Sequence, residues 1–216
     1  ISEWKEKDPI SNYESFLIES KLLTKDDIVE IRNKFTKEIT RNLELAFNEP
    51  LLKPDINTEL KEVYKEHLFK QVRHSKKTSN LRFIDAISDG LFQSMEKNNN
   101  LILMGQDIAE YGGVFKVTEG FAKKFGAERV RNTPICESAI IEVAMGLSIC
   151  NTKSIVELQF SDFITSGFNP VVNYLAKSYY RWGQNADIVL RMPCGAGVGA
   201  GPFHSQTNEA WFTKTP

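Results

Sequence analysis

Leu101-Ile102-Leu103-Met104, closed by Gly105, is a short continuous apolar run, which is the pattern of a buried strand. On either side of it, the sequence pattern predicts strands at 154–160 and 187–192 and helices at 83–95, 137–150 and 162–180. Strands that alternate with helices are typical of right-handed crossovers and a parallel sheet. The sequence therefore predicts an α/β fold, a parallel sheet flanked by helices.

Ligands of such sheets bind at the carboxyl ends of the strands. We expect the turn at 133–137, the turn at 161–163 and the loop after Met192 to lie at that edge. Glu137 follows the stiff Pro134 turn and opens a helix. Its carboxylate could stabilise the helix through the positive end of the helix dipole, or it could share a proton with a bound heterocycle.

His204 follows a glycine-rich loop at 195–202, which lets the backbone approach a ligand closely. This run has no Gly-Lys-Ser/Thr, and Ala200 stands where G-x-G-x-x-G needs its third glycine, so no nucleotide site is predicted. The other histidines lack ligand spacing, so no metal site is predicted either. Phe163 and Gln159 flank the end of a predicted strand, where an aromatic ring is either core or a platform for a flat ring.

Residues 1–65 have helical patterns and form an N-terminal extension. The pairs Ser11–Glu14 and Thr24–Asp27 are candidate capping pairs. An apolar stripe ends before Pro50 and consists of Ile28, Ile31, Phe35, Ile39, Leu43 and Phe47. A basic, weakly apolar stretch at 66–80 is predicted to be a linker, and 81–216 a domain.

Composition excludes several classes of partner. Lys and Arg total 27 against 28 for Asp and Glu, so neither nucleic acid nor an anionic membrane is expected as the main partner. No apolar run approaches the roughly 18 residues that span a bilayer. Three cysteines without metal spacing indicate reduced thiols in the cytosol. The N-terminus lacks both Met and a signal pattern, so we expect a piece of a longer protein.

Six spaced motifs lie within 82–216: GQDI at 105–108, YGGVF at 111–115, TPICE at 133–137, ELQFSDF at 157–163, AK at 176–177 and HSQ at 204–206. Together they resemble the pyrimidine-binding domain of the beta subunit of 2-oxo acid dehydrogenases. These are the thiamine-diphosphate-dependent decarboxylating components of the pyruvate and branched-chain complexes. Residues 1–65 resemble the C-terminal end of the alpha subunit, so the chain resembles the junction of a fused alpha–beta enzyme.

The resemblance implies roles for particular residues. Glu137 would hydrogen-bond a pyrimidine nitrogen of thiamine diphosphate and activate the coenzyme by sharing a proton. Ile135, Gln159 and Phe163 would line the pyrimidine pocket. His204 would transfer protons during reductive acylation of a lipoyl group.

The resemblance also implies partners: a 2-oxo acid, the lipoyl domain of the acyltransferase component, and a second copy in a homodimer equivalent to alpha2beta2. Magnesium would be held by the diphosphate domain, whose motif this chain lacks, so the chain alone would be inactive; a structural potassium ion is a further expectation. The compartment would be the bacterial cytoplasm or the mitochondrial matrix.

Two departures from the family pattern leave alternatives open. Phe163 stands where branched-chain enzymes usually carry Tyr and pyruvate enzymes Phe, so the substrate is not fixed. Glu142 lies where the family usually has glycine after the Glu137 motif. A non-catalytic assembly module and a transketolase-type thiamine enzyme are the alternative functions.

Overall fold

A computed structural model describes residues 2–68 and 78–216. The chain divides into two compact units, Ile1–Pro54 and Asp55–Pro216, and each is described by itself. The linker expected at 66–80 falls mainly on residues 69–77, which lie outside the described residues. No helix in the described ranges combines the length and apolarity needed to cross a membrane.

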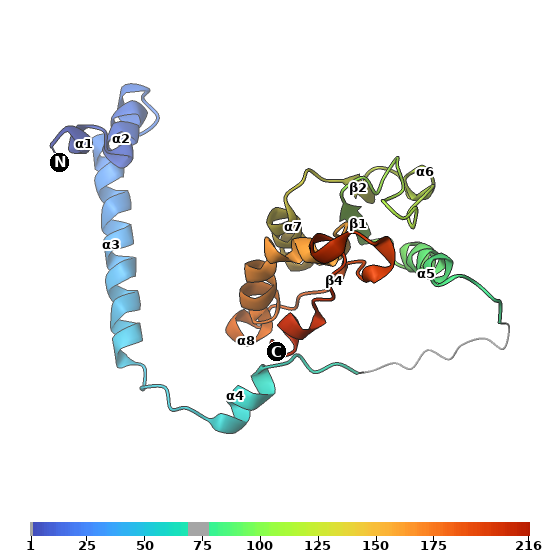
Figure 1. The fold of residues 1–216 in the computed structure, drawn as a ribbon. Coiled ribbons are helices and arrows are strands. Elements are labelled where there is room, and N and C mark those ends of the chain that lie inside the picture. Colours follow the sequence, from blue (N-terminus) through green and yellow to red (C-terminus); the bar gives the residue numbers. More distant parts are fainter. Residues whose placement is uncertain (1, 69–77) are drawn as a thin grey trace. The chain divides into compact units, whose positions relative to one another are not determined.

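The first unit is helical and consists of α1 (Ser2–Glu6), α2 (Pro9–Glu19) and α3 (Lys25–Asn48) (Figure 1). The predicted amphipathic helix is confirmed, and it ends before Pro50 as expected. None of the three helices buries a residue within the described structure. On α3, Phe35 is 58% exposed and Ile39 is 59% exposed. The apolar stripe of α3 is therefore largely exposed within the described part of this unit.

One of the two predicted capping pairs of this unit is confirmed. The backbone N–H of Asp27 donates to Thr24 Oγ1 at 3.2 Å, and the backbone N–H of Thr24 donates to Asp27 Oδ2 at 2.7 Å. Two of the donors at the start of α3 are thereby satisfied, as in a capping box.

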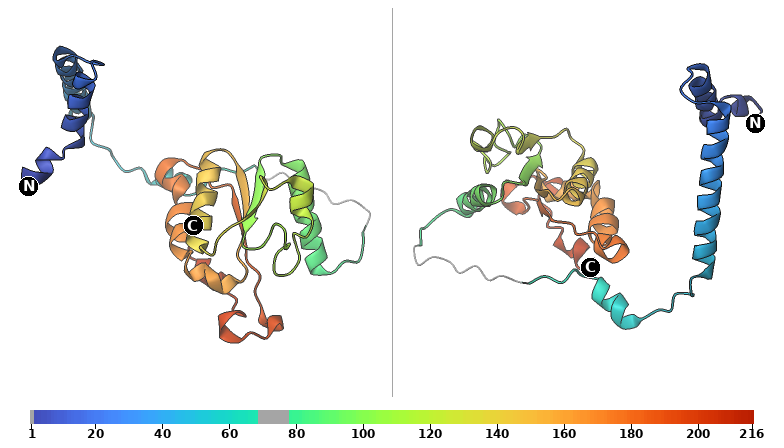
Figure 2. Two further views of the ribbon diagram at one scale, coloured as in Figure 1. Left: turned by 90° about the horizontal axis from the view of Figure 1, so that it is seen from above. Right: turned by 180° about the vertical axis from the view of Figure 1, so that it is seen from behind.

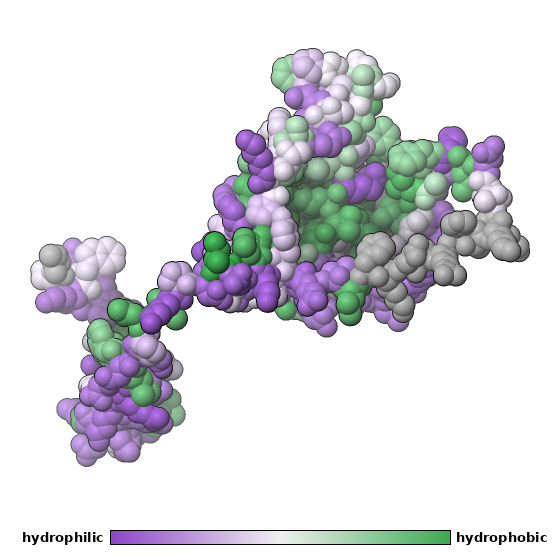
Figure 3. Space-filling model, turned by 90° about the horizontal axis from the view of Figure 1, so that it is seen from below, coloured by the Kyte–Doolittle hydropathy of each residue, from purple (hydrophilic) through white to green (hydrophobic). Residues whose placement is uncertain are grey.

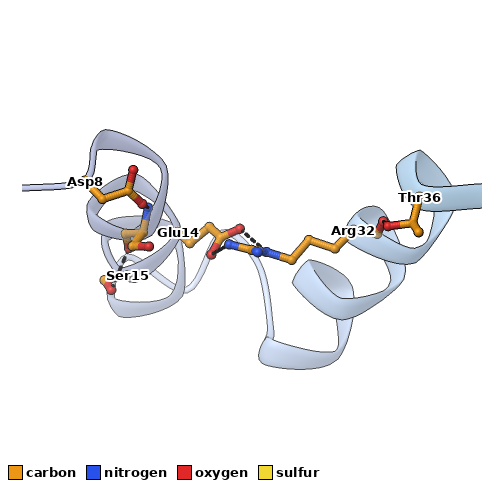
Figure 4. A network of polar contacts seen from close by, with 6 residues as sticks. Asp8, Glu14, Ser15, Arg32 and Thr36 are labelled. Carbon is orange, nitrogen blue, oxygen red and sulfur yellow. Dashed lines mark hydrogen bonds and ion pairs between the residues drawn. The ribbon is translucent and has the colours of Figure 1, made fainter. Parts of the chain in front are cut away.

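The capping pair predicted at Ser11 and Glu14 is wrong. Asp8 caps α2, and its carboxylate accepts from the backbone N–H of Ser11 at 2.8 Å. Pro9 then occupies the first helical position, where a missing N–H costs nothing. Glu14 instead binds the Arg32 guanidinium through two hydrogen bonds of 2.7 and 2.8 Å, which tie α2 to α3 (Figure 4).

The second unit is an α/β domain. Its elements are α4 (Ile56–Glu62), α5 (Phe83–Lys97), β1 (Leu101–Gly105), α6 (Phe121–Phe125), β2 (Val130–Asn132), α7 (Glu137–Ile149), β3 (Lys153–Glu157), η1 (Ser161–Thr165), η2 (Pro170–Leu175), α8 (Ser178–Trp182), β4 (Ile188–Arg191), η3 (Ala196–Val198), η4 (Gly201–Phe203) and η5 (Glu209–Phe212). The strands are all parallel, in the order β2-β1-β3-β4, which confirms the predicted parallel sheet. The sequence patterns did not predict β2 or α6.

Helices α5 and α7 cover opposite faces of the sheet (Figure 2). The cluster on the α5 side includes Met95, Leu103 and Phe121, and the cluster on the α7 side includes Ile141 and Val156. Continuous apolar strands have this arrangement because both of their faces are buried. The sheet is therefore held rigidly between two layers, and its carboxyl edge is free to carry a site.

Two predicted boundaries differ from the structure. The strand predicted at 154–160 ends at Glu157, and the 3-10 turn η1 follows from Ser161. The helix predicted at 162–180 is three short pieces, η1, the π-helical η2 and α8. Pro170 explains the break between η1 and η2, since it has no N–H to donate to the preceding turn and its ring clashes there.

Candidate functional site

The carboxyl ends of β1 and β3 and the start of α7 carry the polar residues of the candidate site. Strand β1 ends at Gly105, β3 ends at Glu157, and α7 begins at Glu137. Strands β1 and β3 are direct neighbours, with Gly105 paired to Glu157. A side chain built on Gly105 would lie 2.5 Å from the carbonyl oxygen of Glu157, so glycine allows this close approach.

Glu137 is half-buried and is held by a residue from β1's end. The amide Nε2 of Gln106 donates to Glu137 Oε1 at 3.2 Å, and Gln106 is only 6% exposed. The N-cap of α7 is Cys136, and no side chain caps this helix start. Among the described residues, Thr133 Oγ1 is buried with no hydrogen-bond partner. Thr133 therefore does not cap α7.

Gln159 is held by Asp107, the residue that follows Gln106. Its Nε2 donates to Asp107 Oδ2 at 3.2 Å. Asp107 has a φ of 56°, in the left-handed region that Asp tolerates better than most residues. Its carbonyl oxygen accepts from the N–H of Gly113 at 2.8 Å, which closes the loop after β1.

Three rings gather beside Gln159. His204 stacks on Phe160 with ring centroids 5.0 Å apart, and it meets Phe163 edge-on at 5.3 Å. Phe160 and Phe163 are themselves perpendicular at 5.9 Å. Within the part of the chain that the structure describes, Nδ1 of His204 is buried and has no hydrogen-bond partner. Because a buried polar nitrogen is normally paired, this atom is available to a ligand or a partner.

A buried ion pair lies at the ends of β3 and β4. Arg191 Nη2 is 3.0 Å from Glu157 Oε2, and the Glu157 side chain is 4% exposed. Burial raises the pKa of Glu157, and the Arg191 charge acts in the opposite direction. The sequence interpretation missed this pair. The signal that could have found it is a charged residue, Glu157, inside the predicted apolar strand at 154–160.

A mainly apolar cavity of about 440 Å³ adjoins the ring cluster. Arg191, Phe160 and His204 are part of its wall, together with residues of α5 and of the glycine-rich loop. Hydrophobic side chains also gather in a hollow on one face of this unit (Figure 3). The ring cluster is therefore reached from a pocket in which water competes weakly with polar contacts.

The predicted site residues fall into one connected network with one exception. Gln106 and Asp107 are consecutive, and they contact Glu137 and Gln159 respectively. Gln159 is followed at once by Phe160, which contacts Phe163 and His204. Ile135, by contrast, is 84% exposed, on the turn before Glu137. Over the described ranges, no group of three or more His, Cys, Asp and Glu has the placement of a metal site.

Sequence comparison identifies the relatives of this chain. Residues 79–216 match the family profile described as "Transketolase, pyrimidine binding domain". The 2-oxoisovalerate dehydrogenase subunit beta of Bacillus subtilis is 39% identical over 138 residues, which are 63% of this chain and 42% of that relative. The pyruvate dehydrogenase E1 component subunit beta of Acholeplasma laidlawii is 40% identical over 138 residues, with the same shares.

Other comparisons are of the same kind. The 3-methyl-2-oxobutanoate dehydrogenase subunit beta of Mycobacterium tuberculosis is 38% identical over 140 residues, 64% of this chain and 40% of the relative. A solved structure described as "Split gene transketolase, inactive beta4 tetramer" has a TM-score of 0.40 at 20% identity, over 51% of this chain and 33% of that one. This chain thus spans about two fifths of its beta-subunit relatives. By its profile match over residues 79–216, the chain belongs to the transketolase pyrimidine-binding domain family.

Proposed function

We propose that this chain supplies the pyrimidine half of a thiamine-diphosphate site in a 2-oxo acid dehydrogenase. The substrate would be a branched-chain 2-oxo acid or pyruvate, since relatives named for each are about equally similar. The observation that carries the proposal is the network from Glu137 through Gln106, Asp107 and Gln159 to the ring cluster. Residues 1–65 would be the end of an alpha-like region, joined by 66–80 to the domain at 81–216.

The side chains of the network fit an aminopyrimidine. Such a ring offers nitrogen atoms and an amino group at its edge, and two flat faces. A carboxylate at Glu137 and an amide at Gln159 suit the edge, and Phe163 suits a face. When bound, the coenzyme supplies the electron sink for decarboxylation. Magnesium, held by residues outside this chain, and a structural potassium ion remain predictions.

The residues of this chain would divide the work. Glu137 would hold a proton at a ring nitrogen, and Gln106 would orient its carboxylate. Phe160 and Phe163 would exclude water, which strengthens the polar contacts inside the site. His204, whose Nδ1 has no partner among the described residues, would transfer protons during acylation of the lipoyl group. Ile135 is exposed in this structure, so it would line the pyrimidine pocket only where another chain covers it.

The partners of the site follow from the same proposal. They would be the 2-oxo acid, the lipoyl domain of the acyltransferase component, and a second copy of the chain. A groove of about 590 Å³ is formed by α7, η2 and α8, and its lining includes Ile141, Met145, Tyr174 and Trp182. This groove supports association through this side. The compartment would be the bacterial cytoplasm, or the mitochondrial matrix in a eukaryote.

Replacement of Glu137 by Gln tests the function in the complete assembled enzyme. We expect decarboxylation to fall by about 10²- to 10⁴-fold, because a positioned acid–base group contributes that much. Glu96→Gln is the matched control, since Glu96 is exposed on α5 and lines neither the cavity at the ring cluster nor the groove beside α7. Calorimetric titration with thiamine diphosphate measures binding alongside turnover. Wild-type turnover in Glu137→Gln would refute the role, and failure of the wild-type enzyme to bind the coenzyme would favour an assembly module.

A further inference from the structure

We propose that the dipeptide Gln106-Asp107 is a positioning device that aims Glu137 with its first residue and Gln159 with its second. This inference depends on the proposed function, because it assigns both residues to the coenzyme site. Both are positioning residues, acting through the side chains that they contact.

Gln106 is suited to hold a carboxylate. It follows β1 directly, so its backbone is fixed by a strand that pairs on both sides with β2 and β3. Its amide is buried and donates to Glu137 Oε1 at 3.2 Å. A neutral amide orients a carboxylate without adding charge to the site. Removing this donor would free the Glu137 side chain to adopt other rotamers.

Asp107 contacts the other target side chain, Gln159, rather than Glu137. Its left-handed backbone conformation, with a φ of 56°, turns the chain sharply after the strand. The turn is closed by the hydrogen bond from Gly113 N–H to the Asp107 carbonyl at 2.8 Å. Asp107 Oδ2 then accepts from the Gln159 amide at 3.2 Å. Consecutive residues thus reach the start of α7 and the segment after β3.

Gln106→Met tests the first half, because methionine keeps the length of the side chain and removes the donor. In the complete enzyme we expect the Kd for thiamine diphosphate to rise and kcat to fall, each by about tenfold to a hundredfold, the value of a hydrogen bond to a charged group. Gln93→Met is the matched control, since the Gln93 amide donates to Asp89 on an exposed part of α5. We expect the control to match the wild-type enzyme.

The double variant Gln106→Met with Glu137→Gln separates positioning from a general structural role. If Gln106 acts through Glu137, the double variant should be no worse than Glu137→Gln alone. Losses that multiply, or a Gln106→Met enzyme with wild-type Kd and kcat, would overturn the inference. If instead Glu137→Gln itself has wild-type turnover and Kd, the proposed function has failed, and that result is distinct.

Two variants of Asp107 test the second half. Asparagine and glycine both accept a positive φ, but only asparagine keeps an acceptor for the Gln159 amide. We expect Asp107→Asn to bind thiamine diphosphate within about twofold of wild type, and Asp107→Gly to bind about threefold to tenfold more weakly. Thermal unfolding without coenzyme reports any separate loss of stability. Equal Kd values for the two variants would overturn the role of the Asp107 carboxylate.

Discussion

The helical unit and the sheet unit of this chain are stabilised by different interactions. The helices of the first unit bury no residue, and their polar contacts include caps, the Lys7–Glu3 pair and the Arg32–Glu14 pair. The sheet unit has fully buried residues such as Ile141 and a buried pair between Arg191 and Glu157. The same types of residue therefore contribute unequally, because burial decides the strength of an apolar contact or an ion pair.

The two units share pKa shifts caused by exposed hydrogen bonds, and the sheet unit adds one caused by burial. In the helical unit, hydrogen bonds from Ser11, Arg32 and Thr24 lower the pKa of Asp8, Glu14 and Asp27 respectively. In the sheet unit, hydrogen bonds from Thr58 and Arg82 likewise lower the pKa of Asp55 and Asp85, whereas burial raises the pKa of Glu157. Acid should therefore weaken these exposed hydrogen bonds in both units, and in the sheet unit alone it should also remove the cost of burying the Glu157 charge.

The largest expected effect is on the ion pairs. Arg191→Met leaves Glu157 buried without its partner, which should cost about 3–5 kcal/mol of the unfolding free energy of the sheet unit. Arg32→Met in the helical unit should cost far less, because its side chain is 58% exposed and water replaces the lost contact. Urea denaturation of both variants makes the measurement. Equal losses would contradict the comparison.

The next largest effect is a difference in stability loss between two isoleucine-to-alanine substitutions, one in each unit. Ile141 has no exposed surface, so Ile141→Ala should cost about 2–5 kcal/mol through lost contacts and a cavity. Ile39 is 59% exposed, and Ile39→Ala should stay within about 0.5 kcal/mol. Denaturation midpoints for the two variants provide the test. A large loss at Ile39 would mean that the stripe on α3 is covered by another chain in solution.

A smaller effect is expected at the cap of α3. Thr24→Ala removes the side chain that accepts from the N–H of Asp27, which should destabilise the helical unit by about 1 kcal/mol. Thr36→Ala, in the middle of the same helix, is the control, and alanine is the better helix former there. Far-ultraviolet circular dichroism during thermal unfolding should show the loss for Thr24 alone. A matching loss at Thr36 would indicate a general helix effect.

The smallest effect is the pH dependence. The raised pKa of Glu157 gives stability that is fully present below its ordinary value of 4.5 and is lost as pH rises through the folded-state pKa. The lowered pKa values of Asp8, Asp27 and Glu14 give stability that is present above 3.8 for Asp and 4.5 for Glu and is lost as pH falls.

Unfolding curves recorded across this pH range check the sign for each unit. In the sheet unit the lowered pKa values of Asp55 and Asp85 act in the opposite direction. Glu157→Gln should therefore remove only the loss of stability with rising pH that Glu157 contributes, and it should leave the helical unit unchanged. A variant whose sheet unit keeps the wild-type pH profile would show that another group titrates.

Local patterns predicted the parts of the fold that local physics controls. The continuous apolar run at 101–104 predicted β1 because both faces of a central strand are buried. The stripe predicted α3 because its spacing of three and four residues is the helical period. The break at Pro170 was missed because apolar spacing continues across it. Strand β2 was missed because three residues with one buried side chain, Val130, carry too little pattern.

The candidate site also has a part that the sequence predicted and a part that it did not. The resemblance of short motifs predicted Glu137, Gln159, Phe163 and His204 as site residues, and these roles stay predictions. The contacts of Gln106 with Glu137 and of Asp107 with Gln159 join residues far apart in the sequence. Such pairings depend on which strands become neighbours, and one sequence taken alone does not determine that order.

Strand β4 is an edge strand of the sheet, so in the described chain one side of its backbone has no strand partner. Val189, in its middle, is 56% exposed. A free edge of this kind is a template on which strands of other molecules can add, and proteins commonly blunt such edges with lysine. Concentrated samples are therefore prone to aggregate through β4, and Val189→Lys is the substitution best suited to keeping them dispersed.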